Sequence, residues 1–309
     1  MTLQQLEYIV ALDTYRHFVT AAEHCFVTQP TLSMQVLKLE EEIGTLIFDR
    51  KKQPVEPTKA GTQILLKARQ ILREVNQLKA LVSDEKESTE GLFRLGIIPT
   101  VAPYLIPLFV GEFMKEHPKT SLSIEEMKSS DIIEGLKNDT LDLGILATPL
   151  SEKQLREVPL YYEPFLLYVS EHHPLYKKKV VQSKDVNQEG LWILNQGHCF
   201  RSQVLNICKP KNQVDKVGLH YESGSIETLK KIIDANDGYT LVPELSITND
   251  QDKKLSRRFE EPQPVREISI VTHNSFTKEV LIEDLRKSIL NKLPSTFKKN
   301  KRFYTVKWR

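Results

Sequence analysis

Two cysteines that could carry out redox chemistry, Cys199 and Cys208, lie nine positions apart. Cys199 follows Gly197 and His198, where the pattern predicts the beginning of a helix, and Arg201 comes two positions later. A helix N-terminus and nearby cations lower the pKa of a thiol, and the thiolate is the form that attacks the O–O bond of a peroxide. The sulfenic acid that results condenses with a second thiol. Cys208 is the candidate for that second thiol.

The separation of the two sulfurs limits what this pair can do. Nine residues of continuous helix rise by about 13.5 Å, whereas a disulfide requires Cα atoms about 4.4–6.8 Å apart. If these cysteines bond, the segment between them must refold. From the residues alone, the interpretation of Cys199 and Cys208 as two inert buried cysteines is favoured over a redox pair, and both interpretations stay open. A zinc site fits less well, because there is no Cys-x-x-Cys pair and His198 beside Cys199 does not supply four ligands. We therefore expect no metal and no cofactor, and we interpret Cys25 as an inert core residue.

The composition indicates a folded protein of two or three domains, with 309 residues of which 40% are hydrophobic and 27% charged. Residues 1–5 show no secretory signal, and prolines interrupt the most apolar stretch, residues 97–114, so we expect a cytoplasmic protein without a membrane span.

The first 58 residues hold five Lys or Arg against eight Asp or Glu, so an argument for DNA binding must depend on local pattern. The basic segment from Arg286 is interpreted as a solvated helix end and tail, with an auxiliary nucleic-acid contact as the alternative.

Three short helices are predicted at the start of the chain. Apolar residues recur at helical spacing in Leu3–Phe18, a second helical unit covers Thr20–Cys25, and a third helix begins at Pro30 and ends at Gly44. The polar face of the third helix carries short hydroxyls and amides, which a recognition helix uses to contact phosphates and base edges. An ordinary amphipathic helix would show the same pattern, so helical spacing alone leaves both interpretations open.

A long helix without proline is predicted over residues 58–87. Its apolar residues step alternately by four and three, the heptad spacing through which two helices pair. These residues are Ile64, Ala68, Ile71, Val75, Leu78 and Val82. The helix is therefore predicted to dimerise the protein, and the polar residues 83–91 are predicted to form a hinge.

Strand-like and helix-like runs alternate through the rest of the chain. The strand-like runs cover residues 92–98, 121–126, 141–147, 165–170, 191–194, 217–221, 239–242 and 268–272. The helical runs cover residues 104–116, 131–137, 226–235 and 277–293. This alternation predicts an α/β fold with mainly parallel strands. Ligands of such folds bind at the carboxyl ends of strands or in a cleft between lobes.

The first 65 residues closely resemble the winged helix-turn-helix of LysR-type transcriptional regulators. The matching runs include Ala21-Ala22, Val27-Thr28-Gln29-Pro30-Thr31-Leu32-Ser33, Leu39-Glu40, Phe48-Asp49-Arg50 and Thr58-Lys59-Ala60-Gly61. The resemblance implies that residues 29–35 enter the major groove of DNA and that the wing around Arg50 contacts phosphates. The implied DNA contacts are Thr28, Gln29, Pro30, Thr31, Ser33, Met34, Gln35, Lys38, Arg50 and Lys51. Met34 departs from the small or basic residue often found at its position.

The order of elements after the long helix resembles the effector domain of the same family, which is similar to a periplasmic binding protein. The resemblance implies a winged helix-turn-helix over residues 1–58 and a dimerising linker helix with a hinge over 59–90. It also implies a two-lobed α/β regulatory domain over 91–309. Lobe I would comprise about 91–162 and 268–309, and lobe II about 163–267.

The run Gly197-His198-Cys199-Phe200-Arg201-x-Gln203, together with Cys208, resembles the peroxide-sensing members of this family almost residue for residue. The resemblance implies that Cys199 reacts with hydrogen peroxide and that Cys208 resolves the product as a reversible disulfide. Hydroxyls would hold the peroxide and an arginine would stabilise the thiolate. The implied supporting residues are Thr100, Ser129, His198 and Arg266. Ser129 replaces a more usual threonine and keeps the hydroxyl, whereas Ser202 replaces an acidic residue.

The resemblance also implies partners. A regulator of this kind is a homodimer or homotetramer, binds double-stranded DNA at paired half-sites, acts with RNA polymerase as an activator of oxidative-stress defence genes, and is reset by a cellular dithiol reductant. It is not an enzyme and has no membrane partner. Two alternatives stay open at this point: a LysR-type regulator of a small organic anion with Thr100 and Ser129 in its pocket, and a thiol peroxidase.

Overall fold

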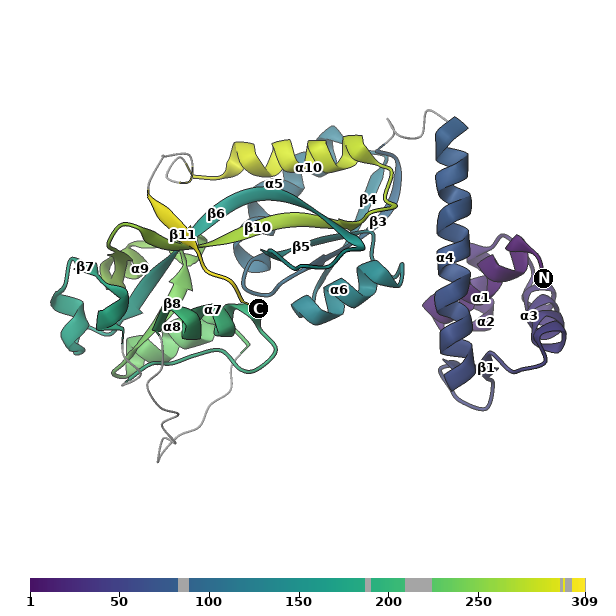
Figure 1. Cartoon of the computed structure of the whole chain (residues 1–309), viewed down its shortest axis with the longest axis horizontal. Helices are drawn as coiled ribbons and strands as arrows, with labels where there is room; N and C mark the ends of the chain where they lie inside the picture. The colour runs from purple at the N-terminus through teal and green to yellow at the C-terminus, as the bar shows by residue number, and fades with distance from the viewer. Residues whose placement is uncertain (83–88, 187–189, 209–223, 295–296, 298–301, 309) are drawn as a thin grey trace. The chain divides into compact units, whose positions relative to one another are not determined.

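The computed structural model describes residues 1–82, 89–186, 190–208, 224–294, 297 and 302–308. The chain divides into two compact units. The N-terminal unit holds residues 1–87 with two short segments, 138–140 and 275–277, and the regulatory unit holds the remainder. Each unit is described by itself below, and both are drawn in Figure 1.

The N-terminal unit begins with three helices. These are α1 (Leu3–Tyr15), α2 (Phe18–His24) and α3 (Gln29–Ile43). The third helix has Pro30 in its first turn and Gly44 as its C-cap at φ 75°, which confirms its predicted limits. The first helix ends three residues earlier than predicted, because Arg16 adopts a left-handed conformation at φ 54° and caps it. Apolar faces of all three helices form one buried core.

A small wing follows these helices. It consists of β1 (Phe48–Asp49) and β2 (Glu56–Pro57), which pair antiparallel. The buried carboxylate of Glu40 accepts hydrogen bonds from the backbone N–H groups of Ile47 and Phe48, at 2.8 and 3.1 Å, and so fixes the start of the wing to α3. A Cβ atom at Gly61 would lie 1.9 Å from the carbonyl oxygen of Ile47, so only glycine allows the next helix to pass this close to the wing.

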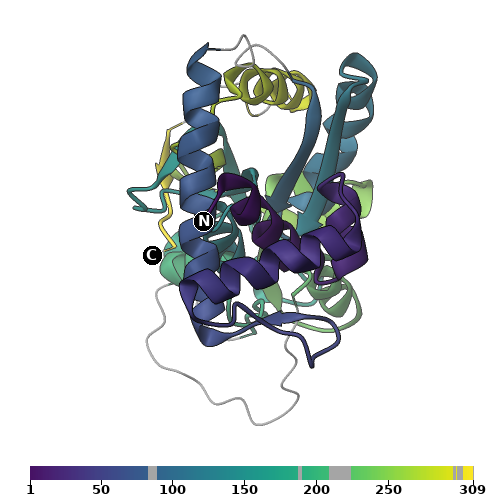
Figure 2. The same ribbon diagram turned by 90° about the vertical axis from the view of Figure 1, so that its right-hand side faces the viewer.

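The long helix α4 (Lys59–Val82) completes the N-terminal unit and is drawn in Figure 2 as the long blue helix. Its 24 residues correspond to a rise of about 36 Å. The predicted apolar seam divides into two parts. Ala68 is buried and Ile64 is half-buried against the core of this unit, whereas 39% of Ile71 and 65% of Leu78 remain exposed. Residues 83–87 of the predicted helix and the side chain of Val82 lie outside the described part of the chain.

The regulatory unit is built on a nine-stranded sheet in the order β4-β3-β5-β10-β6-β9-β7, with β8 paired to β6 and β11 paired to β10. The strands are β3 (Gly91–Ile97), β4 (Thr120–Glu126), β5 (Leu143–Thr148), β6 (Leu155–Val169), β7 (Val180–Val181), β8 (Tyr239–Pro243), β9 (Ser256–Phe259), β10 (Gln263–His273) and β11 (Phe303–Thr305). The helices are α5 (Ala102–Glu116), α6 (Ser129–Lys137), α7 (Cys199–Cys208), α8 (Ile226–Ala235), α9 (Asp250–Leu255) and α10 (Glu279–Lys292).

Two long strands, β6 and β10, join the lobes and run through both of them in Figure 1. Lobe I contains β3, β4 and β5 with α5, α6 and α10, and lobe II contains β7, β8 and β9 with α7, α8 and α9. The prediction of mainly parallel strands is wrong. The strand β10 pairs antiparallel with both β5 and β6, and β6 pairs antiparallel with β8 and β9. The strand β6 passes from lobe I to lobe II and β10 passes back from lobe II to lobe I, so the two neighbouring strands run in opposite directions.

Three other expectations have different outcomes. The predicted strand at 191–194 is reduced to isolated bridge residues, Leu191 and Leu194, and Leu191 is bridged to Tyr239. The predicted strand at 217–221 lies outside the described residues. The basic end of the chain is not simply a solvated tail, because its residues Phe303–Thr305 form β11 and Val306 is buried. None of the helices in the described part of the chain is long and apolar enough to cross a membrane.

Candidate functional site

The cysteine pair occupies the two ends of one helix. Cys199 is the first residue of α7 and Cys208 is the last, which confirms the prediction that Cys199 begins a helix. Both side chains are free thiols, with 4% and 6% of their surface exposed. Since the helix is continuous between them, their Cα atoms are separated by about 13.5 Å along its axis. The structure is therefore that of the dithiol form, and the two sulfurs are too far apart to bond.

The surroundings of Cys199 act on its pKa in opposite directions. Burial has the largest effect and raises the pKa of the thiol. The nearby hydroxyl of Ser129, the charge of Arg266 and the backbone N–H groups at the start of α7 lower it. For Cys208, burial alone raises the pKa to about 12. Cys199 is therefore the thiol with groups around it that favour the thiolate.

The expectation that His198 and Arg201 supply the activating charge is wrong. Burial, and then the charge of Lys128, lower the pKa of His198, so its imidazole is neutral at neutral pH. The guanidinium of Arg201 donates to the carbonyl oxygen of Leu194 at 2.7 Å. The cation that lowers the Cys199 pKa is Arg266, which is close to the thiol only in the folded chain.

Arg266 lies in a fully buried network, with 1% of its surface exposed. Its Nη1 donates to the hydroxyl of Thr100 at 2.8 Å, and its Nη2 donates to the Thr100 carbonyl at 3.0 Å. Its Nε and Nη2 donate to Oε2 of Glu163 at 2.9 and 2.7 Å. The guanidinium also lies 5.1 Å from the ring centroid of Phe200, the residue after Cys199. All these contacts hold the cation in one orientation beside the start of α7.

Two hydroxyls that the sequence predicted to hold a ligand lie in the same environment. Thr100 follows β3, and because its hydroxyl oxygen accepts from Arg266, its proton remains available to another acceptor. Ser129 begins α6 with 3% exposure, and its hydroxyl has no hydrogen-bond partner of good geometry in the described residues. Its proximity to the Cys199 thiol still lowers the pKa of that thiol. Thr100, Ser129, Cys199 and Arg266 thus form one buried site.

Sequence reasoning missed three residues of this site. Glu163 is the counter-ion of Arg266, with an equally low exposure of 1%, and it also accepts the backbone N–H of Leu245 at 3.0 Å. Tyr161 is buried, and its hydroxyl has no hydrogen-bond partner among the described residues. Tyr104 donates to Glu227 at 2.7 Å, which joins α5 of lobe I to α8 of lobe II. The signal for Glu163 was present in the sequence, since it is the one acidic residue in the apolar run from Leu160 to Val169.

The predicted DNA contacts gather at the start of α3 and in the wing. Thr28 is the N-cap of α3, and its hydroxyl lies 2.8 Å from that of Thr31. Pro30, Met34 and Lys38 are exposed, whereas Gln29, Thr31, Ser33 and Gln35 are half-buried. Gln35 accepts a hydrogen bond from Gln5 of α1 at 3.2 Å.

The predicted wing residues differ in their surroundings. Arg50 donates to the buried carboxylate of Glu40 at 2.9 Å and lies 5.6 Å from the ring centroid of Phe18. The side chain of Arg50 is therefore exposed, and its contacts with Glu40 and Phe18 hold it in place. The side chain of Lys51 is exposed, with its backbone N–H donating to the carboxylate of Asp49 at 3.0 Å.

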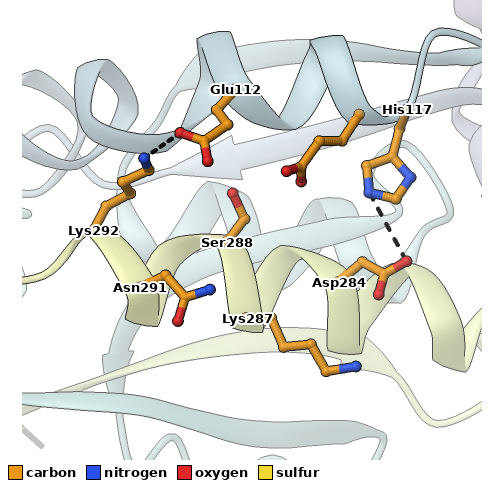
Figure 3. A pocket seen from close by; sticks show the side chains of 8 residues that line it. Glu112, His117, Asp284, Lys287, Ser288, Asn291 and Lys292 are labelled. Carbon is orange, nitrogen blue, oxygen red and sulfur yellow. Dashed lines mark ion pairs between the residues drawn. The ribbon is translucent and has the colours of Figure 1, made fainter.

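A separate pocket lies between α5 and α10 in lobe I, as Figure 3 shows. Its lining residues are Glu112, Glu116, His117, Asp284, Lys287, Ser288, Asn291 and Lys292. Lys292 pairs with Glu112, and His117 lies 3.9 Å from Asp284. None of the predicted site residues lines this pocket. No group of three or more His, Cys, Asp or Glu side chains in the described part of the chain is placed to hold a metal ion.

Comparison with known families identifies both units. Residues 3–62 match the model of the bacterial regulatory helix-turn-helix protein, lysR family, and residues 86–294 match the LysR substrate binding domain. The hydrogen peroxide-inducible genes activator of Haemophilus influenzae is 36% identical over 273 residues, which cover 88% of this chain and 90% of the relative. The DNA-binding transcriptional dual regulator OxyR of Escherichia coli is 34% identical over 301 residues, which cover 97% of this chain and 98% of the relative.

Solved structures agree with these matches. A full-length OxyR variant from Pseudomonas aeruginosa superposes with a TM-score of 0.82 at 33% identity, covering 94% of this chain and 98% of that one. OxyR from Porphyromonas gingivalis superposes with a TM-score of 0.64 at 30% identity, covering 70% of this chain and 99% of that one. The helix-turn-helix unit and the two-lobed α/β regulatory fold are thus features of proteins to which this chain is similar. The chain belongs to the LysR family of bacterial transcriptional regulators.

Proposed function

We propose that this protein is a hydrogen peroxide-sensing transcription activator that is switched by a reversible disulfide between Cys199 and Cys208. The observation that carries the proposal is the buried thiol of Cys199 at the start of α7, beside Ser129 and Arg266, with a second thiol at the other end of the same helix. Relatives that share about a third of its residues are named hydrogen peroxide-inducible genes activators.

The proposed chemistry takes two steps. The Cys199 sulfur attacks one oxygen of hydrogen peroxide, the O–O bond breaks, and the leaving hydroxide takes up the thiol proton to give water and a sulfenic acid. The Cys208 sulfur then attacks the Cys199 sulfur, the S–O bond breaks, and a second water leaves as the S–S bond forms. The two thiols lose two electrons and the peroxide gains them. A cellular dithiol returns both thiols by exchange and is itself oxidised to a disulfide.

The buried residues divide the work of the first step. Arg266 and the start of α7 stabilise negative charge on the Cys199 sulfur. The hydroxyls of Thr100 and Ser129 supply hydrogen bonds that hold the peroxide, and the neutral imidazole of His198, the residue before Cys199, is a further hydrogen-bonding group. One solved OxyR structure, from Corynebacterium glutamicum at 25% identity, is described as hydrogen peroxide-bound, and its likeness to this chain supports a site of this kind.

The second step requires α7 to change shape. The two Cα atoms must approach from about 13.5 Å to about 4.4–6.8 Å, which no regular helix allows. Oxidation therefore exchanges one packing of lobe II for another. A disulfide that closes so short a loop constrains the chain by roughly 3 kcal/mol, comparable to the difference between two packings of a bistable element.

The DNA-binding part of the proposal rests on α3, the wing and α4. Gln29 and Ser33 at the start of α3 would contact base edges and phosphates in the major groove, and Lys51 would contact phosphates from the wing. The exposed Ile71 and Leu78 of α4 would pair with the same residues of a second copy, so that a dimer or tetramer binds paired half-sites. Activation then requires RNA polymerase at the same promoter.

The test is mass mapping of the full chain under non-reducing conditions, before and after one equivalent of hydrogen peroxide. We expect a peptide in which Cys199 is bonded to Cys208, and loss of helical protection across α7 in hydrogen exchange. A regulator of a small organic anion would leave both thiols free. A thiol peroxidase would consume many equivalents of peroxide rapidly in the presence of a dithiol, whereas a sensor is expected to turn over slowly.

A further inference from the structure

The last described residues of the chain, Phe303–Trp308, pack on the helix that carries both cysteines. This segment, which we name the C-terminal strap, begins as β11 and pairs parallel with β10, with Phe303 opposite Gln263. The backbone N–H of Val306 donates to the carbonyl of Val265 at 2.8 Å, which continues this pairing beyond the strand. The side chain of Val306 is 5% exposed and belongs to the same apolar core as Phe200, Val204 and Ile207 of α7.

Two side chains of α7 donate hydrogen bonds to the strap, in addition to its pairing with β10. Nε2 of Gln203, a fully buried residue, donates to the carbonyl of Val306 at 2.8 Å. Nδ2 of Asn206 donates to the carbonyl of Lys307 at 2.8 Å. These two residues are three positions apart and so lie on the same face of the helix, one turn along from each other. The strap and α7 are thus joined by hydrogen bonds that depend on the helical spacing of Gln203 and Asn206.

The strap also reaches the other lobe. The indole Nε1 of Trp308 donates to the carbonyl of Ala147, the residue before the end of β5 in lobe I, at 3.1 Å. Phe303 packs against Tyr162 with ring centroids 4.9 Å apart. One short segment therefore contacts the helix of the thiol pair, the long strands that join the lobes, and lobe I.

We propose that the C-terminal strap is a redox-coupled clamp, which holds α7 as a helix in the dithiol form and is released when Cys199 and Cys208 bond. This inference rests on the proposed disulfide switch. Gln203 and Asn206 lie between the two cysteines, so the refolding that shortens the separation of Cys199 and Cys208 must displace at least one of them. The docked strap and the disulfide therefore exclude each other.

Two equilibria that exclude each other are linked reciprocally. If disulfide formation releases the strap, then undocking the strap must favour the disulfide by the same factor. Loss of the Val306 anchor is expected to raise the equilibrium constant for disulfide formation about tenfold, which makes the reduction potential of the pair about 30 mV more negative.

The experiment uses the full chain and two variants. Val306→Asp places a carboxylate in the apolar site of the strap, and Lys307→Ala is the matched control, because it alters an exposed neighbouring side chain and keeps the main-chain carbonyl that Asn206 uses. The dithiol and disulfide fractions are measured in glutathione buffers of stepped potential by alkylation and mass spectrometry. We expect a shift of about tenfold in Val306→Asp, a smaller shift in the same direction in Asn206→Ala, and none in Lys307→Ala.

Hydrogen exchange of the unmodified chain provides the second measurement and does not depend on any variant folding. After mass mapping confirms the Cys199–Cys208 bond, the amides of residues 303–308 should lose protection relative to the dithiol form. A disulfide that forms while the strap keeps its protection overturns the clamp and leaves the proposed function intact. An unchanged redox equilibrium in a folded Val306→Asp variant also overturns it. If peroxide produces no Cys199–Cys208 bond, the proposed function fails and the clamp fails with it.

Discussion

Arg266 and Glu163 face each other across the antiparallel pair of β10 and β6, and their side chains form an ion pair with Nη2 and Oε2 2.7 Å apart. Both side chains are 1% exposed. The cation that lowers the Cys199 pKa is thus itself partly neutralised by a carboxylate. Since the two residues bear opposite charges, changes to each of them should move the reactivity of the thiol in opposite directions.

Removal of the cation should slow the reaction of Cys199 with peroxide. Because Arg266→Met alone would leave a buried carboxylate unpaired, the variant to test is Arg266→Met with Glu163→Gln. We expect the pKa of Cys199 to rise and the rate at pH 7 to fall about tenfold for each unit of that rise. The measurement is stopped-flow oxidation across pH 6–8, with Arg156→Met, an exposed arginine of lobe I, as the control. Identical kinetics in all three proteins would exclude Arg266 from the site.

Glu163→Gln alone should have the opposite effect on the thiol. The guanidinium then keeps its full charge, so we expect a lower Cys199 pKa and a faster reaction at pH 7 than in the unmodified chain. An unpaired buried cation also costs stability, on the order of 3–5 kcal/mol of the free energy of unfolding. Glu279→Gln breaks an exposed ion pair with Arg156 and should cost no more than about 1 kcal/mol. A slower reaction in folded Glu163→Gln would show that the carboxylate acts in another way.

The raised pKa of Cys199 also predicts how the reaction depends on pH. Burial raises the pKa of the thiol above its ordinary value, so the thiolate is the minor form at neutral pH. The rate should therefore rise as pH increases from 6 to 8, and the two variants above should shift that rise to higher and to lower pH. A rate that is flat over this range in the unmodified chain would mean that the thiol is already ionised.

The resolving thiol has its own prediction. In Cys208→Ser, peroxide should still oxidise Cys199, but the product should remain a sulfenic acid or oxidise further, because no second thiol condenses with it. Cys199→Ser should stay in the dithiol-like arrangement and leave Cys208 unmodified, since burial raises the pKa of Cys208 to about 12. A sulfenic acid probe with mass spectrometry distinguishes these products. If the probe labelled Cys208 in the Cys199→Ser protein as strongly as it labels Cys199 in the Cys208→Ser protein, the assignment of the two roles would be contradicted.

The DNA-binding surface can be tested without peroxide. The double variant Gln29→Ala/Ser33→Ala should lose roughly 1–3 kcal/mol of operator binding for each contact to a base edge. Gln4→Ala, an exposed amide on α1, serves as the matched control. Fluorescence anisotropy with a labelled operator at fixed salt concentration measures both. Equal affinity of the double variant and the control would remove α3 from the interface.

How much the sequence could predict depended on whether a feature is local. Helix limits are encoded locally, so α3 with Pro30 and Gly44 and the helix 226–235 were predicted almost to the residue. The start of α7 at Cys199 was predicted for the same reason. The resemblance to LysR-type regulators supplied the two-lobed fold, and it supplied Thr100, Ser129 and Arg266 as neighbours of the thiol.

Only the tertiary structure decided the electrostatics of the site and the place of the chain end. Glu163 and Arg266 are 103 positions apart, and they meet because the pairing of β6 with β10 sets them opposite each other. His198 directly precedes Cys199 and Arg201 lies two positions after it, yet neither is among the groups that lower the pKa of the thiol. The basic tail appeared solvated by composition, but Val306 reaches the core beside α7. Burial and strand pairing act between distant segments, and sequence spacing does not contain that information.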